Sequence, residues 1–263
     1  MKKRIITAIV AGVFFMLFAA IGGVLFTLLM ITLATIAIAE LLKMKKIAYL
    51  SPPGGIAFLL TWFVVMPDDW LRQLTNSPTD KVDSFLFALL LLLTLTVVSK
   101  NKFSFDDISF VLMSSLYAGF GFYYMAVTRL SPEGLPILFF VLVLIWMTDS
   151  GAYFIGKSFG KKKLWPDISP NKTVEGAVGG ILSALVVALI FHAVYPLFHL
   201  PQALLIALVT SVFAQVGDLV ESALKRHYEV KDSGQLLPGH GGILDRCDSW
   251  IFVFPILHLF QLI

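Results

Sequence analysis

Charged residues are scarce in this sequence, and their scarcity argues against a soluble fold. Only 14% of the 263 residues are Asp, Glu, Lys or Arg, whereas 58% are hydrophobic. Soluble domains typically hold about 25% and about 45–50% of these classes. The apolar residues also lie in continuous runs, without an alternating or amphipathic pattern. No charged residue occurs from Ile5 to Ala39, which is long enough for two membrane-spanning helices of about 20 residues each.

Cysteine is nearly absent as well. The one residue of this type, Cys247, excludes an intrachain disulfide and leaves the redox compartment open. Tandem repeats, low-complexity tracts and polar linkers are also lacking, so we expect one membrane domain. Lys2-Lys3-Arg4 followed by an apolar run is also typical of a signal peptide. Here the apolar region is too long, and no small-residue cleavage pattern precedes another polar domain.

Apolar runs bounded by charge, proline or glycine predict an all-α polytopic membrane protein with about nine transmembrane helices. Gly22-Gly23 is the expected turn between the first two helices, and Ser51-Pro-Pro-Gly-Gly is expected to kink the third or open a cavity. The predicted helices cover residues 5–21, 23–42, 47–66, 84–99, 107–128, 135–156, 174–197, 201–224 and 245–262.

The distribution of basic residues supports this assignment. With a cytoplasmic N-terminus, the cytoplasmic segments hold all but three of the 20 Lys and Arg residues, as the positive-inside rule predicts. The exceptions are Arg72, Lys81 and Arg129. The C-terminus then lies on the far side of the membrane. The two long cytoplasmic loops are residues 157–173 and 225–245, although topology alone also explains a basic loop.

Acidic residues lie near the cytoplasmic ends of three predicted helices. An ionisable group within a span costs about 2.5–3.5 kcal/mol on insertion scales and by default indicates function. These acids are Asp149, Asp218, Glu221, Asp245 and Asp248. Helical spacing puts Asp218, Ser222 and Lys225 on one helix face, and it puts Asp245 and Asp248 on one face of the last helix.

Carboxylates that converge near water repel one another unless a cation neutralises them. Hard oxygen ligands suit Mg²⁺, which usually takes one or two carboxylates plus waters and substrate phosphates. The predicted metal ligands are Asp218, Asp245 and Asp248, and the predicted additional or supporting groups are Asp149, Glu221 and Ser222. The alternative is that these acids pair with nearby Lys and Arg or cap helix N-termini, where the helix dipole favours anions.

Glycine-rich segments beside these acids indicate phosphate binding. Glycines let backbone N–H groups approach phosphates closely, although glycine also marks ordinary turns. One segment holds Gly234, Gly239, Gly241 and Gly242 between Lys231 and Asp245, and the other holds Gly156, Gly160, Lys157 and Lys161–Lys163. Ser169-Pro170 is typical of a helix start, which would aim Asn171, Lys172 and Thr173 at the same region.

Two segments carry a long pattern of fixed residues. The first contains Ser222-Ala-Leu-Lys225-Arg226, Lys231-Asp232-Ser-Gly234 and Leu237-Pro238-Gly-His240-Gly241-Gly242-Ile-Leu-Asp245-Arg246-Cys247-Asp248; the second contains Asp149-Ser-Gly-Ala-Tyr153, Gly156-Lys157, Gly160-Lys161, Ile168-Ser-Pro-Asn-Lys172-Thr173 and Glu175-Gly176. Together they resemble the phosphatidate cytidylyltransferase (CDP-diacylglycerol synthase) family. The resemblance covers about Trp146 to Trp250, and Cys247 departs from it where an aliphatic residue is expected.

The resemblance implies that the chain converts CTP and phosphatidate to CDP-diacylglycerol and pyrophosphate at the cytoplasmic face of the inner membrane. It implies Mg²⁺, a second and monovalent cation such as K⁺, and a homodimer in the lipid bilayer. A nucleic-acid partner is not expected. Residues 1–130 would form a scaffold with dimer contacts, and residues 131–263 would form the catalytic region.

The phosphomonoester of phosphatidate, with a second pKa of about 6, is largely anionic at neutral pH, so the protein mainly has to position reactants and neutralise charge. The groups expected to bind CTP phosphates or pyrophosphate are Lys225, Arg226, Lys231, His240, Gly241, Gly242 and Arg246. His240 is alternatively a general acid. Asn171, Lys172 and residues 157–163 would hold nucleotide or lipid headgroup.

Two other functions remain open at this point. One is a related cytidylyltransferase that acts on another lipid phosphate. The other is an ion-coupled transporter, which the clustering of acids at one interface, away from the midplane, argues against.

Overall fold

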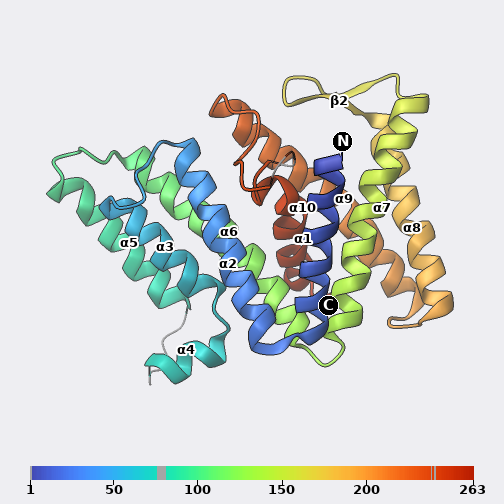
Figure 1. Ribbon diagram of the computed structural model, residues 1–263, viewed down its shortest axis with the longest axis horizontal. Helices are drawn as coiled ribbons and strands as arrows, with labels where there is room; N and C mark the ends of the chain where they lie inside the picture. Colours follow the sequence, from blue (N-terminus) through green and yellow to red (C-terminus); the bar gives the residue numbers. More distant parts are fainter. Residues whose placement is uncertain (1, 76–80, 238, 240) are drawn as a thin grey trace. The chain divides into compact units, whose positions relative to one another are not determined.

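The computed structural model describes residues 2–75, 81–237, 239 and 241–263. Within this part the chain forms helices joined by short connections and one two-stranded hairpin (Figure 1). The helices are α1 (Lys2–Ile21), α2 (Gly23–Met44), α3 (Pro52–Val65), α4 (Asp68–Thr75), α5 (Lys81–Val98), α6 (Phe105–Leu130), α7 (Gly134–Phe159), α8 (Val174–Val194), α9 (Leu200–His227) and α10 (Leu244–Leu259), and the strands are β1 (Lys163–Trp165) and β2 (Ser169–Thr173).

The predicted helical fold is confirmed, and each predicted helix corresponds to a helix of the structure. Helix α4 and the hairpin are additions. Among the described residues, six helices are long and apolar enough to cross a membrane, namely α2, α5, α6, α7, α8 and α9. A total of nine spans and the orientation of the termini stay predictions.

The turn at Gly22-Gly23 lies where it was predicted. Helix α1 ends at Ile21, and α2 begins at Gly23. Gly22 has φ 69° and ψ −153°, and Gly23 has φ 54°. Positive φ values of this kind are uncommon for residues with a Cβ, so two glycines suit this connection.

The two Ser-Pro segments behave differently from the predictions. Ser51 is the N-cap of α3, because its Oγ accepts from Gly54 N over 3.3 Å. The prolines that follow occupy the first turn of α3, so the segment starts this helix and does not kink it. The predicted helix start at Ser169-Pro170 is wrong. These residues belong to β2, and α8 begins at Val174 with Thr173 as its N-cap, whose Oγ1 accepts from Gly176 N over 3.1 Å.

Pairing between the strands explains this second difference. Strand β2 runs antiparallel to β1, with Lys163 opposite Thr173 and Trp165 opposite Ser169. Proline is tolerated there because a two-stranded hairpin consists of edge strands. The chain therefore stays extended until Thr173, whose side chain provides the cap.

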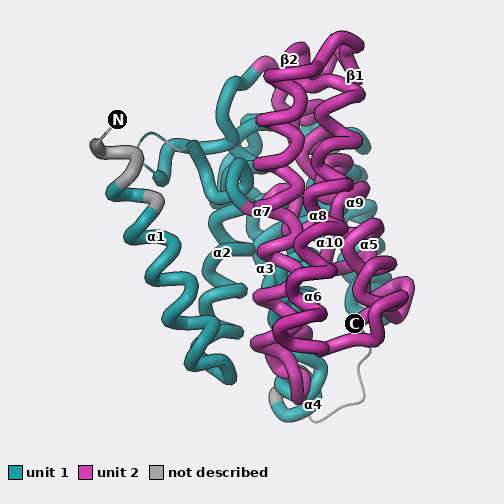
Figure 2. Tube along the Cα trace, turned by 90° about the vertical axis from the view of Figure 1, so that its right-hand side faces the viewer, with its two compact units in different colours: residues 1–127, 230–246 teal, residues 128–229, 247–263 magenta. Residues whose placement is uncertain are grey.

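The chain divides into two compact units (Figure 2). Unit 1 contains residues 1–127 and 230–246, and unit 2 contains residues 128–229 and 247–263. The segment 230–246, which carries the glycine-rich loop, thus packs with the N-terminal helices. Helix α10 begins in unit 1 and continues in unit 2.

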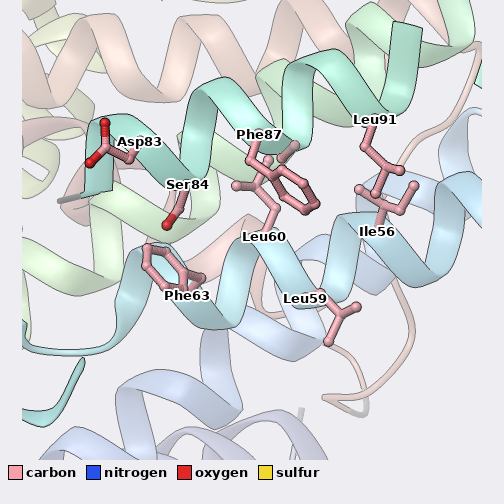
Figure 3. Close-up of a pocket in the computed structure, with 9 residues that line it drawn as sticks. Ile56, Leu59, Leu60, Phe63, Asp83, Ser84, Phe87 and Leu91 are labelled. Carbon is pink, nitrogen blue, oxygen red and sulfur yellow. The ribbon is translucent and has the colours of Figure 1, made fainter. Parts of the chain in front are cut away.

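Unit 1 is built on apolar contacts among its helices. Helix α2 packs against α1 and α3, and α3 packs against α5. Ile38, Leu42, Ala57, Ile108 and Val111 form one buried cluster. A cavity of about 540 Å³ lies between α3 and α5, and apolar side chains of both helices point into it (Figure 3).

Unit 2 depends on glycines that let its helices approach closely, as small residues do in membrane helix pairs. Helix α7 packs against α8 and α9. A Cβ added at Gly176 would lie 2.8 Å from Ala152 O, and one at Gly180 would lie 2.8 Å from Thr148 O. Gly217 of α9 lies against α10 in the same way. A Cβ added at Gly217 would lie 2.9 Å from Asp248 O.

We expect Gly180→Ala to destabilise unit 2 by about 1–3 kcal/mol, because the added methyl group overpacks a tight helix contact. Gly12→Ala is the matched control, since a Cβ at Gly12 meets nothing within 4 Å. This substitution brings the same gain in helix propensity as Gly180→Ala. The measurement is the thermal unfolding midpoint of the detergent-solubilised protein. Equal midpoints for the two variants would contradict the close α7–α8 packing.

Candidate functional site

Predicted site residues gather around a cavity of about 490 Å³ in unit 2. Asp149, Lys157, Asn171, Lys172 and Asp218 all line it. They come from α7, β2 and α9, and the hairpin contacts the ends of α7 and α8 (Figure 1). The fold therefore brings part of the predicted loop 157–173 to the acids of two apolar helices.

The hairpin is fixed by an acid in the first turn of α8. The carboxylate of Glu175 accepts from Lys161 N over 3.0 Å and from Lys162 N over 3.2 Å. At its far end, Arg226 Nε donates to Ile168 O over 3.3 Å. Lys172 therefore reaches the cavity from strand β2 of this hairpin, and not from the helix start that the sequence predicted.

Asp218 is the centre of the polar contacts at the cavity. Lys172 Nζ lies 2.7 Å from Asp218 Oδ2, and Ser222 Oγ donates to Asp218 Oδ1 over 3.3 Å. The second contact follows from the i, i+4 spacing within α9. The first was not foreseen, because Lys172 lies 46 positions earlier in the chain.

Two further acids share the electrostatic environment of Asp218. Asp149 interacts with Asp218 and Lys172, and Asp248 interacts with Asp218, Asp149 and Lys225. Contact between α9 and α10 brings Asp248 near, because Ser249 Oγ donates to Ala214 O over 3.1 Å. Unit 2 therefore gathers three carboxylates with two lysines.

Glu221 forms an ion pair within its own helix. Its side chain is only 1% exposed, and it forms an ion pair with Lys225, one turn further along α9. This pair holds Lys225 beside the acidic group, while Glu221 itself does not line the cavity.

The other predicted metal ligand, Asp245, lies in unit 1. Its Oδ2 atom accepts from Ser233 N over 2.9 Å and from Gly242 N over 2.8 Å, and Ser233 Oγ lies 2.9 Å away. An acid that reaches back to a backbone N–H before its helix resembles the acid of a capping box. Asp245 therefore holds the glycine-rich loop at the start of α10, and its role as a metal ligand stays a prediction.

The remaining predicted residues divide between the units. Gly241 and Gly242 lie in the glycine-rich loop, where Gly241 has φ +83°. Lys231 is exposed on the same segment, and Arg246 is the last residue of unit 1. His240 lies outside the described residues. Cys247, the departure from the family pattern, is buried at 4% exposure.

The donor atoms of unit 2 fit the chemistry of Mg²⁺. Asp149, Asp218, Asp248 and Ser222 offer only oxygen, and this ion needs just one or two carboxylates beside waters and phosphates. Across the described ranges, no group of three or more His, Cys, Asp or Glu is already arranged around a metal position. A cation here would thus depend on substrate oxygens to complete its coordination.

Two residues at the sites were missed by the sequence reasoning. Gln215 lines the cavity, and its Nε2 donates to Ser211 O over 3.0 Å. Glu40, in α2, is 7% exposed and accepts hydrogen bonds from the glycine-rich loop. The criterion that selected Asp149, an acid inside an apolar helix, also applies to Glu40.

Comparison with known proteins gives a consistent result along the whole chain. The cytidylyltransferase family profile matches residues 2–263. The chain is 50% identical to a phosphatidate cytidylyltransferase of Bacillus subtilis over 263 residues, which covers 98% of this chain and 96% of the relative. It is 46% identical to one of Staphylococcus saprophyticus over 264 residues, with 98% of both chains covered.

We expect Glu175→Ala to release the hairpin, because Lys161 N and Lys162 N lose a charged acceptor. Trypsin should then cut after Lys161–Lys163 about 10-fold faster, which corresponds to a loss of ~1.5 kcal/mol from hydrogen bonds to a charged group. Asp167→Ala, which removes an acid from the turn of the same hairpin, should leave the cutting rate unchanged. Equal rates for both variants would contradict the role of Glu175.

Proposed function

The chain belongs to the cytidylyltransferase family, and from that premise we propose that it converts CTP and phosphatidate to CDP-diacylglycerol and pyrophosphate in phospholipid biosynthesis. The observation that carries the proposal is the cavity of unit 2, which Asp149, Asp218 and Lys172 line. Asp248 interacts electrostatically with both acids and with Lys225. The relatives named phosphatidate cytidylyltransferase support the same substrates.

The reaction is a nucleotidyl transfer. A phosphate oxygen of phosphatidate forms a bond to the α-phosphorus of CTP, and the bond from that phosphorus to the bridging oxygen of the β-phosphate breaks. Pyrophosphate leaves with the electron pair. Because a phosphomonoester with a second pKa of about 6 is largely anionic at neutral pH, a strong general base is unnecessary. Catalysis then rests on positioning and on charge stabilisation.

The chain's cations and acids take complementary parts in this proposal. Lys172, Asn171 and Lys157 border the cavity and would contact phosphate oxygens of nucleotide or lipid. Lys225, Arg226, Lys231, His240 and Arg246 would bind the triphosphate or the leaving pyrophosphate. Asp218, Asp245 and Asp248 would hold Mg²⁺, and Asp149 and Ser222 would support them. When bound, the divalent ion neutralises charge on the phosphates, and we propose a monovalent cation such as K⁺ as its companion.

The membrane arrangement is part of the proposal. A site at headgroup depth on the cytoplasmic side lets CTP arrive from water while the acyl chains stay in lipid. The excess of Lys and Arg in the predicted cytoplasmic segments supports this orientation. We also propose that the 29.1 kDa chain forms a homodimer, as the family resemblance implies, and native mass spectrometry in nanodiscs would test this.

Labelling of single cysteines in intact cells tests the orientation. In a Cys247→Ser background, Glu133→Cys lies between α6 and α7, and Lys162→Cys lies in the hairpin after α7. We expect a membrane-impermeant maleimide to label only the first, because one membrane-spanning helix separates the two positions. The hairpin position should react after the cells are opened. Labelling of Lys162→Cys in intact cells would contradict a cytoplasmic site.

We expect Asp218→Asn and Asp245→Asn each to lower turnover strongly. Mutation of a group that only supports a metal ligand typically lowers activity by about 10–100-fold, and the loss of a ligand itself should exceed that. The assay follows pyrophosphate release by purified protein with phosphatidate and, separately, with a polyprenyl phosphate. Release should depend on phosphatidate and on Mg²⁺. Asp69→Asn, in the short helix α4, is the charge-matched control and should keep full turnover. Near-normal turnover of either site variant, with an unchanged unfolding midpoint, would exclude its role as a ligand.

A further inference from the structure

Glu40 is a buried acid with contacts far along the chain. It lies near the end of the apolar helix α2 and is 7% exposed. Its Oε1 accepts from Ile243 N over 2.9 Å, and its Oε2 accepts from Leu244 N over 2.9 Å. Ile243 directly precedes α10 and Leu244 is its first residue, and all three residues belong to unit 1. Backbone donors thereby offset the cost of burying a charged group.

Glu40 also explains two of the glycines. A Cβ added at Gly234 or at Gly242 would overlap the Oε1 atom of Glu40. The hydrogen bonds to Ile243 and Leu244 hold that carboxylate in place, so it has little freedom to move aside. Gly234 and Gly242 therefore make room for Glu40, whereas the sequence alone attributed these glycines to phosphate approach.

A serine connects Glu40 to Asp245. Ser233 Oγ lies 2.9 Å from Glu40 Oε2 and 2.9 Å from Asp245 Oδ2. Ser233 N donates to the same Asp245 oxygen over 2.9 Å. The hydroxyl group thus lies within hydrogen-bond distance of both carboxylates and donates its one proton to either of them. A displacement of Glu40 would move both the loop and the groups that hold Asp245.

We infer that Glu40 is a positioning residue, which fixes the glycine-rich loop and the orientation of Asp245 for the reaction. The inference rests on the proposed function, because it takes this loop and Asp245 as parts of the nucleotide site. A helix start needs only a local Ser, Thr, Asp or Asn as its cap. Here a charged residue of a distant apolar helix holds the loop, the start of α10 and the serine beside Asp245 together. This assigns the N-terminal helices a part in the reaction beyond scaffolding.

Two measurements on the purified full chain test this inference. The first is amide hydrogen exchange across residues 230–246, which reports loop position without any catalysis. The second is steady-state turnover, with the KM for phosphatidate and the kcat/KM for CTP determined separately. The variants are Glu40→Ala and Glu40→Gln, where Gln keeps one carbonyl acceptor. Thr27→Val is the control within α2, since the Thr27 hydroxyl donates to Gly23 O of its own helix.

For Glu40→Ala we expect faster exchange at Ile243 and Leu244 and a kcat/KM for CTP lowered by about 10–100-fold, as for other groups that orient a metal ligand. The KM for phosphatidate should stay unchanged. Glu40→Gln should recover part of both effects, and Thr27→Val should match the wild type. Unchanged exchange in Glu40→Ala would overturn the inference. Faster exchange with full turnover would overturn it too, because the loop would then not matter to the reaction.

Ser233→Ala approaches the same network from the loop and covers the case in which Glu40→Ala does not fold. It removes the bridging hydroxyl but keeps the backbone bonds from Ile243 and Leu244 to Glu40. We expect a normal unfolding midpoint with lowered kcat/KM for CTP, and normal kcat/KM would contradict the inference. Failure of the proposed function would look different: the wild type itself would release no pyrophosphate from CTP and phosphatidate, whatever the exchange results.

Discussion

A carboxylate in an apolar helix is stable only when cations or hydrogen-bond donors surround it, and the polar part of this protein follows from that constraint. In unit 2, Lys172 binds Asp218, and Lys225 binds Glu221. In unit 1, backbone N–H groups and Ser233 surround Glu40. Each unit thus keeps a buried or half-buried negative charge by bringing distant segments to it. Under the proposed function, the acids of unit 2 would also hold a cation together with the phosphates that accompany it.

Close backbone approach is the second requirement, and glycine provides it. Gly176 and Gly180 let α8 lie against α7, and Gly217 lets α9 lie against α10. These contacts bring Asp149, Asp218 and Asp248 within electrostatic range of one another. In unit 1, Gly234 and Gly242 leave the space that Glu40 occupies. Loss of a glycine would therefore act on the site through the spacing of helices and loop.

Much of the fold could be predicted because long apolar runs are read directly as helices. The face shared by Asp218 and Ser222 could be predicted from helical spacing. The hairpin could not, since its strands are short, basic and without alternation, and Ser169-Pro170 is also typical of a helix start. The Lys172–Asp218 contact and the bonds of Glu40 depend on tertiary packing between segments up to about 200 positions apart, which no local pattern reveals. Glu40 itself could have been identified from the sequence, because it is an acid within a predicted apolar helix.

The fate of the phosphorus atoms of CTP tests the central claim most directly. Purified protein in lipid nanodiscs would receive CTP labelled with ³²P at either the α- or the γ-phosphorus, with phosphatidate and Mg²⁺ present or omitted. We predict that the α-label enters chloroform-soluble lipid only when both are present, while the γ-label appears only in pyrophosphate. Label that never enters lipid from a folded protein, or γ-label that does, would contradict a cytidylyl transfer to phosphatidate.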